Sequence, residues 1–137
     1  MIGIVLVAHG QLGAELLKAA ELIIGSQQKC HTVAIEMNLS PDYLSDMIAK
    51  AIKLQDNGRG VLIITDMFGG TPTNISLSFH EDGKVEVITG ANLPMLLKAI
   101  EYRKKPDVDL RTLAKVTLDY ALKSIYIASD MLRGPRK

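Results

Sequence analysis

The chain has 137 residues, enough for one domain with a hydrophobic core that needs no disulfide staples. Hydrophobic residues make up 47% of it and aromatic residues only 4%, so the core must be aliphatic. A formal net charge of +1, spread along the chain, argues against nucleic acid as a partner. The single cysteine allows no internal disulfide, and no apolar run approaches the ~20 residues that a membrane span needs. We therefore expect one soluble domain over residues 1–137, located in the cytoplasm.

Short apolar runs and amphipathic segments alternate along the chain. The apolar run at 2–8 is typical of a strand buried on both faces, and it ends in His9-Gly10. Apolar residues then recur at helical spacing as far as Gly25, a typical helix stop. The expected elements, in chain order, are a strand at 2–8, a helix at 12–24, a strand at 30–36, a helix from 41 to the turn at 57–58, a strand at 61–65, a helix at 72–79, a strand at 84–89, a helix at 94–102 and a helix from 110 to about 122.

This alternation predicts the fold class α/β, an open doubly wound α/β/α sandwich with a mainly parallel sheet of four strands. A charged loop is expected at 103–108. The segment 124–128 is ambiguous, because periodicity does not separate a continued helix from a strand. The basic residues Arg133, Arg136 and Lys137 are too few for a binding arm, and we expect them to form a solvated terminus.

The third predicted strand runs into the most informative stretch of the sequence. Asp66 follows the strand directly, and Gly69 and Gly70 let the backbone approach whatever binds there. Thr71 is expected to cap the next helix, with Pro72 as its first residue, where a missing N–H costs nothing. Because the start of a helix favours an anion, this stretch predicts an anion-binding site that lacks only a nucleophile.

Two further strands also end in polar, loop-forming residues. His9-Gly10 follows the first strand, and Asn92 comes shortly after the fourth. In open α/β sheets ligands lie beyond the carboxyl ends of the strands, so His9 and Asp66 meet at one rim if the first and third strands are neighbours. A carboxylate that binds one imidazole nitrogen fixes the tautomer and leaves the other nitrogen as a nucleophile.

A phosphoryl group at this rim would be held by backbone N–H groups and by a hydroxyl at the helix start. The residues expected to bind it are Gly10, Gly69, Gly70 and Thr71. Phe68, Pro72 and Asn92 are expected to form the rim that partners meet, with the Phe68 ring shielding the site or facing a partner. One His and one Asp make an incomplete metal site, and the sequence has no nucleotide-binding glycine motif, so no metal and no cofactor is expected.

Each of these residues also has a plain structural interpretation. A histidine at a strand end is often satisfied by a neighbouring loop, and an aspartate before two glycines is often a turn former. Thr-Pro is more often an ordinary helix start than a phosphate site. His9, Asp66 and a helix start that can bind an anion are all expected at one rim, and this coincidence favours a functional site over the structural interpretation.

Three motifs, His9-Gly10, residues 66–74 and residues 90–96, together resemble a known family. From residue 1 to about residue 120 the chain is similar to the IIA domain of the mannose/fructose/sorbose class of the bacterial phosphoenolpyruvate-dependent sugar phosphotransferase system (PTS). The resemblance implies that His9 carries the phosphoryl group on Nε2 and that Asp66 holds the other ring nitrogen. It also implies a homodimer, which in some members exchanges a C-terminal strand, so that 124–128 would be an edge strand on the partner subunit.

By this resemblance the chain takes a phosphoryl group from the carrier protein HPr and passes it to a IIB partner. It would meet the membrane only through transporter subunits. Two departures from the family pattern are present. Ala8 stands where members often have a hydroxyl residue, and the sequence ends where many members continue through a linker into a IIB domain, so a stand-alone IIA protein is expected.

Three other functions stay open at this point. The first is a regulatory phosphocarrier whose His9 phosphorylation state is read by a partner without sugar transport. The second is a receiver-type domain phosphorylated on Asp66. That chemistry needs magnesium held by acidic residues at the end of the first strand, where the sequence has Ala8-His9-Gly10. The third is a small-ligand binder without catalysis.

Overall fold

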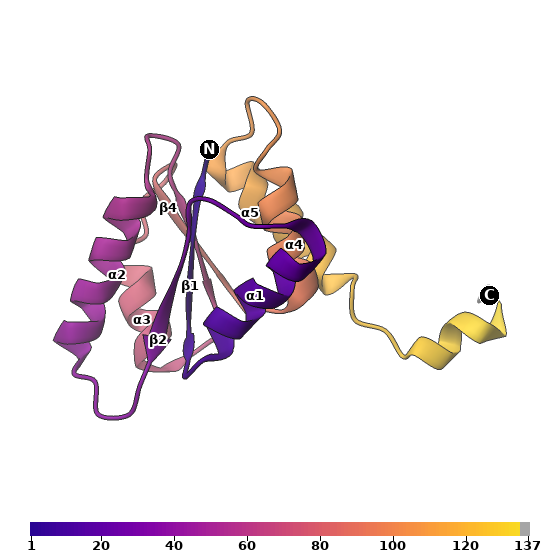
Figure 1. Cartoon of the computed structure of the whole chain (residues 1–137), viewed down its shortest axis with the longest axis horizontal. Coiled ribbons are helices and arrows are strands. Elements are labelled where there is room, and N and C mark those ends of the chain that lie inside the picture. Colours follow the sequence, from indigo (N-terminus) through magenta and orange to yellow (C-terminus); the bar gives the residue numbers. More distant parts are fainter. Residues whose placement is uncertain (135–137) are drawn as a thin grey trace.

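The computed structural model describes residues 1–134, and its elements follow the expected alternation (Figure 1). Arg136 and Lys137, expected in the solvated terminus, lie outside the described residues. No helix within residues 1–134 is long and apolar enough to cross a membrane. The elements are β1 (Gly3–His9), α1 (Leu12–Ile24), β2 (Cys30–Ile35), α2 (Pro41–Gln55), β3 (Val61–Thr65), α3 (Gly70–Ser78), β4 (Val85–Thr89), α4 (Leu93–Tyr102), α5 (Leu110–Leu122) and the 3-10 helix η1 (Ala128–Arg133).

The four strands form one parallel sheet in the order β2-β1-β3-β4. The chain adds β2 on one side of β1 and then places β3 on the other side, so the winding reverses between β1 and β3. This confirms the predicted doubly wound α/β fold. In the register of the sheet Val7 pairs with Thr65, which brings the carboxyl ends of β1 and β3 to one edge. A reversal of this kind opens a crevice beyond the carboxyl ends of the strands.

Helices cover both faces of the sheet: α2 and α3 lie on one face, and α1, α4 and α5 lie on the other (Figure 1). Side chains of a strand alternate between the faces, as the two-residue period requires. From β1, Ile4 and Leu6 join the core under α1, α4 and α5, whereas Val5 and Val7 join the core under α2. Because both faces are covered, the strand is apolar on both sides and its sequence is one continuous apolar run.

The amino end of the sheet is closed by a buried arginine. Arg103, the first residue after α4, is only 2% exposed. Its guanidinium donates to the backbone carbonyl oxygens of Ile2, Lys29 and Gln28 at 2.9, 3.1 and 2.6 Å, and it lies 3.6 Å from the thiol of Cys30. The charged loop predicted here is present, but the burial of its first side chain was not foreseen, because the carbonyl groups that bind it are distant in sequence.

After α5 the chain leaves the body of the domain (Figure 1). The ambiguous segment 124–128 neither continues the helix nor pairs as a strand: residues 123–127 form a turn and irregular backbone, and η1 begins at Ala128. We call residues 123–134 the C-terminal arm. A strand needs a neighbouring strand to pair with, and no other segment within residues 1–134 pairs with the arm. Its exposed apolar side chains are Ile125, Tyr126, Ile127, Met131 and Leu132.

Candidate functional site

His9 and Asp66 meet at the carboxyl edge of the sheet. His9 is the last residue of β1, and Asp66 directly follows β3. One carboxylate oxygen, Asp66 Oδ2, accepts a hydrogen bond from the backbone N–H of His9 at 2.9 Å and lies 2.8 Å from the ring atom Nδ1. The predicted contact is present because β1 and β3 are neighbours in the sheet. The catalytic roles of the two residues stay predictions.

The histidine ring is held on one side and open on the other. The side chain of His9 is 56% exposed, whereas that of Asp66 is 10% exposed. Since Nδ1 faces the carboxylate, we assign the ring proton to Nδ1, which leaves a lone pair on Nε2. That atom can react with a group that arrives from solvent.

The carboxyl of Asp66 is held in its ionised form. Burial raises its pKa, but the hydrogen bonds from the backbone N–H and the ring of His9 lower it by more, so the pKa lies below its usual value. An ionised carboxylate orients the imidazole and stabilises the positive charge that develops on the ring when Nε2 attacks.

The helix after Asp66 begins two residues earlier than predicted. The N-cap residue of α3 is Gly69, which has a φ of 105°, and in the described part of the chain no side chain caps this helix. The prediction that Thr71 is the N-cap and Pro72 the first helical residue is therefore wrong. Pro72 is the third residue of the helix, where a backbone N–H would still have no intrahelical partner, so proline fits there as well. Glycine at position 69 takes the positive φ without strain, and the helix can begin directly after the loop.

The predicted phosphoryl-binding residues fall into two groups. The N–H of Gly10 donates to the carbonyl oxygen at the end of β2 at 2.9 Å, and the N–H of Gly69 donates to the hydroxyl of Thr73 at 3.1 Å. These two glycines therefore shape their loops, and their N–H groups are engaged inside the protein. Gly70 and Thr71 are exposed in the first turn of α3, where N–H groups have no intrahelical partner. Their N–H groups remain available to an anion.

Two features of this edge were not foreseen from the sequence. Thr73, only 1% exposed, donates its hydroxyl to the carbonyl oxygen of Met67 at 2.9 Å and accepts from Gly69. The start of α1 follows His9 closely, and no side chain of residues 1–134 caps it either. A hydroxyl residue four positions after a glycine could have indicated the first feature, and the short connection after β1 could have indicated the second.

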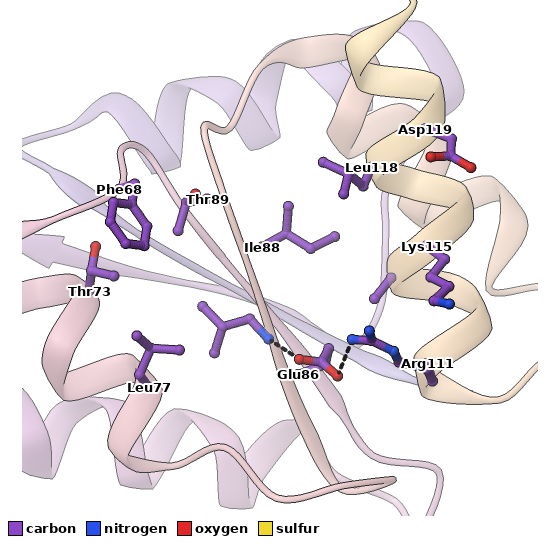
Figure 2. Close-up of a pocket in the computed structure, with 12 residues that line it drawn as sticks. Phe68, Thr73, Leu77, Glu86, Ile88, Thr89, Arg111, Lys115, Leu118 and Asp119 are labelled. Carbon is purple, nitrogen blue, oxygen red and sulfur yellow. Dashed lines mark hydrogen bonds and ion pairs between the residues drawn. The ribbon is translucent and has the colours of Figure 1, made fainter.

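The three predicted rim residues differ in their surroundings. Phe68 is 76% exposed, and its ring stands beside Thr73 at one end of a groove (Figure 2). Pro72 is half-buried in the first turn of α3. Asn92 caps α4, because its side-chain oxygen accepts from the backbone N–H of Met95 at 2.8 Å. The structure therefore gives Asn92 a helix-capping role.

A groove of about 580 Å³ runs along β4 between α3 and α5 (Figure 2). We call it the β4 groove. Its floor is the strand, with Ile88 in it, and an ion pair at 3.1 Å joins Glu86 of the floor to Arg111 of α5. Neither member of the His9–Asp66 pair lines the groove, but Phe68 does, which places one end of the groove beside the candidate site.

Comparisons of sequence and of structure find that components of the phosphotransferase system are similar to this chain. The Escherichia coli (strain K12) protein YadI is 33% identical over 105 residues, which are 76% of this chain and 72% of that protein. The PTS system fructose-specific EIIA component of Bacillus subtilis (strain 168) is 30% identical over 105 residues, again 76% of this chain and 72% of the relative. Among solved structures, the phosphotransferase system component EIIA from Streptococcus agalactiae matches with a TM-score of 0.85 at 27% identity, covering 95% of this chain and 99% of that one.

A family described as the PTS system fructose IIA component, EIIA-man, matches residues 3–114. That range contains the whole sheet and both members of the His9–Asp66 pair. The match confirms the resemblance that the three sequence motifs indicated. The chain therefore belongs to the EIIA-man family and is an EIIA-type component of the phosphotransferase system.

Proposed function

We propose that this chain is a phosphohistidine carrier of the bacterial phosphoenolpyruvate-dependent sugar phosphotransferase system. Nε2 of His9 accepts a phosphoryl group from HPr and passes it to a IIB partner. The observation that carries the proposal is the 2.8 Å contact between His9 Nδ1 and Asp66 Oδ2, together with the exposure of the ring. Membership of the family supports the same assignment.

Each transfer exchanges one bond to phosphorus for another. The Nε2 lone pair attacks the phosphorus of the phosphohistidine on HPr, and the phosphorus–nitrogen bond to HPr breaks, its electron pair returning to the imidazole of HPr. In the second transfer a nucleophile on IIB attacks the phosphorus, and the electron pair of the breaking bond returns to Nε2 of His9. Between the two steps the ionised Asp66 stabilises the positive charge of the substituted ring.

Backbone groups at the start of α3 hold the phosphoryl oxygens in this proposal. Gly70 and Thr71 supply N–H groups, and Thr71 adds its hydroxyl. Gly10 and Gly69 keep the two loops in shape, since their own N–H groups are engaged. Phe68, exposed beside the site, gives a partner protein an aromatic side chain to pack against.

No cofactor takes part, because transfer between two histidines needs positioning and charge stabilisation alone. In this proposal the carrier works in the cytoplasm. It meets the membrane only through the transporter subunits that its IIB partner serves.

Incubation with phosphoenolpyruvate, enzyme I and HPr, followed by measurement of the intact mass, tests the proposal. We expect one added phosphoryl group that survives base and is lost in acid, whereas an acyl phosphate on Asp66 would be lost in base. His9→Ala should abolish the addition. The control His31→Ala removes an exposed histidine of β2 and should leave the addition intact. No incorporation from an HPr that phosphorylates another acceptor would contradict the carrier role.

We also propose a homodimer in which the C-terminal arms are exchanged. β4 is an edge strand, so one side of its backbone has no strand partner among residues 1–134, and the β4 groove lies along it. In the arm, Ile125 and Ile127 are exposed and two residues apart, so both would face one side of a strand. Added beside β4 of a second copy, the arm would bury them. Light scattering should find a dimer for the full chain and a monomer for a chain that ends at residue 123; a monomeric full chain would contradict the exchange.

A further inference from the structure

Thr73 holds the loop between Asp66 and the start of α3. Its hydroxyl donates to the carbonyl oxygen of Met67 at 2.9 Å and accepts from the N–H of Gly69 at 3.1 Å. One side chain is thereby hydrogen bonded to both the first and the last residue of the turn formed by residues 67–69. The side chain is 1% exposed and also lines the end of the β4 groove beside Phe68 (Figure 2).

The helix itself does not require a threonine at this position. Threonine is a poorer helix former than many residues, and a buried hydroxyl costs free energy unless it is hydrogen bonded. Two other buried hydroxyls, those of Ser76 and Thr117, have no hydrogen-bond partner within residues 1–134. Thr73 differs from them because both of its hydrogen bonds go to the loop. Its hydroxyl is therefore used to fix the loop conformation.

We propose that Thr73 is a positioning residue for phosphoryl transfer. By fixing the turn at 67–69, it sets where Asp66 Oδ2 meets the ring of His9 and directs the first N–H groups of α3 toward the site. Gly69, which ends the turn, and Gly70, the first residue of α3, have φ of 105° and 79°, so without this hydroxyl the backbone at this junction has more alternative conformations. The inference rests on the proposed function, since positioning affects transfer only if His9 reacts.

Valine at position 73 keeps the shape of the side chain and removes both hydrogen bonds. We expect Thr73→Val to slow phosphorylation by phosphorylated HPr about tenfold to a hundredfold, because a small displacement of a positioned group has an effect of this size. The loss should lie mainly in kcat, the rate constant of transfer at saturating HPr. Thr73→Ser keeps the hydroxyl and should restore most of the rate. Thr117→Val is the matched control, since it removes a buried threonine hydroxyl that has no partner among the described residues, and it should leave the rate unchanged.

Nuclear magnetic resonance measures the same effect without any phosphoryl transfer. In the wild-type chain the N–H of Gly69 should exchange with solvent more slowly than that of Gly70, and the ring of His9 should show one tautomer, with the proton on Nδ1. In Thr73→Val the exchange at Gly69 should accelerate, and the two ring nitrogen shifts should converge as the tautomers mix. Equal exchange at the two glycines in the wild type would overturn the inference even if the valine variant does not fold.

The outcomes separate this inference from the proposed function. If the wild-type chain takes no phosphoryl group from HPr, the proposed function fails, and the exchange and tautomer measurements still decide what Thr73 does to the loop. If the wild type reacts and Thr73→Val reacts at the same rate, the inference is overturned. It is also overturned if Thr73→Ser is as slow as Thr73→Val, because the hydroxyl would then not be the group that matters.

Discussion

The two ends of the sheet use charged side chains in opposite ways. At the amino end, Arg103 is buried and donates to three backbone carbonyl groups. At the carboxyl end, Asp66 binds His9 through a single oxygen, and the ring of His9 is exposed to solvent. One end of the sheet is closed, and the other is open at a defined atom, Nε2.

This difference separates stability from function along a single strand. Arg103 binds the carbonyl of Ile2, directly before β1, and β1 ends in His9. A hydrogen bond to a charged group contributes about 1.5–3 kcal/mol to stability, so the arginine anchors the strand at the end away from the candidate site. The open end leaves a nitrogen of the ring without such a bond, and that nitrogen is available to react. Changes at the amino end should therefore act mainly on stability, and changes at the carboxyl end mainly on transfer.

Asp66→Asn should give the largest change, and it should appear in transfer. A neutral amide neither stabilises the charged ring nor fixes its tautomer. We expect the rate of phosphorylation by HPr to fall about 10²–10³-fold, as when a preorganised electrostatic partner is removed from an active site. Asp82→Asn changes an exposed carboxylate near His80 and should leave the rate unchanged. Rapid-quench measurement of both variants decides the matter; an Asp66→Asn chain as fast as the wild type would exclude the role assigned to the carboxylate.

Arg103→Met should change stability with little effect on transfer. The substitution removes the guanidinium that donates to three backbone carbonyl groups, among them the buried carbonyl of Ile2, so we expect the free energy of unfolding to fall by about 3 kcal/mol in a urea titration. Arg111→Met is the matched control: this arginine is exposed and paired with Glu86, and its loss should cost less than about 1 kcal/mol. Equal losses in the two variants would show that the buried arginine does not anchor the amino end.

The pH dependence of stability should distinguish Asp66 from an ordinary carboxylate. Its pKa in the folded chain lies below the usual value, so its contribution is complete above the unfolded pKa of about 3.9 and is lost as the pH falls through the folded pKa. The stability of the wild type relative to Asp66→Asn should therefore shrink as the pH falls below ~4. Urea titrations from pH ~5 downward measure this difference. A difference that grows on acidification has the wrong sign for this account.

The smallest effect is expected at Cys30, beside Arg103. Burial raises the pKa of this thiol, and the neighbouring guanidinium lowers it by less, so the thiol is protonated and reacts slowly at neutral pH. A thiol reagent should label it more slowly than it labels the urea-unfolded chain. Labelling should accelerate in Arg103→Met, because the amino end opens more often. Wild-type labelling as fast as in the unfolded chain would mean that this end of the sheet is not closed.

The fold could be predicted because local patterns and topology agree. The helix expected at 12–24 is α1 to the residue, since its apolar stripe and the glycine after it mark both ends. The site pair was predictable for a topological reason. His9 and Asp66 are 57 positions apart, but His9 ends β1 and Asp66 directly follows β3, and the carboxyl ends of neighbouring parallel strands lie at one edge.

The features that could not be predicted from the sequence depend on contacts that leave no periodic pattern in it. The hydrogen bond from Arg103 to Ile2 spans 101 positions, and no spacing rule marks it. The sequence predicts Thr71 as a helix cap because Thr-Pro is a typical helix start, but the positive φ of Gly69 lets the helix begin earlier. The conformation of the C-terminal arm in an exchanged dimer depends on a second chain, which one sequence does not describe.

Asp66 Oδ2 binds the main chain and the ring of the same residue, His9. This two-point attachment ties the side chain to its own backbone, so the imidazole has one orientation before any partner protein arrives. Immobilising a freely rotating side chain in an interface costs about 0.5–1.5 kcal/mol of rotamer entropy. Here that entropy is lost once, on folding, and neither encounter with a partner repeats the loss. In the proposed function, two different proteins would meet the same ring in turn, and neither encounter would carry this entropy cost.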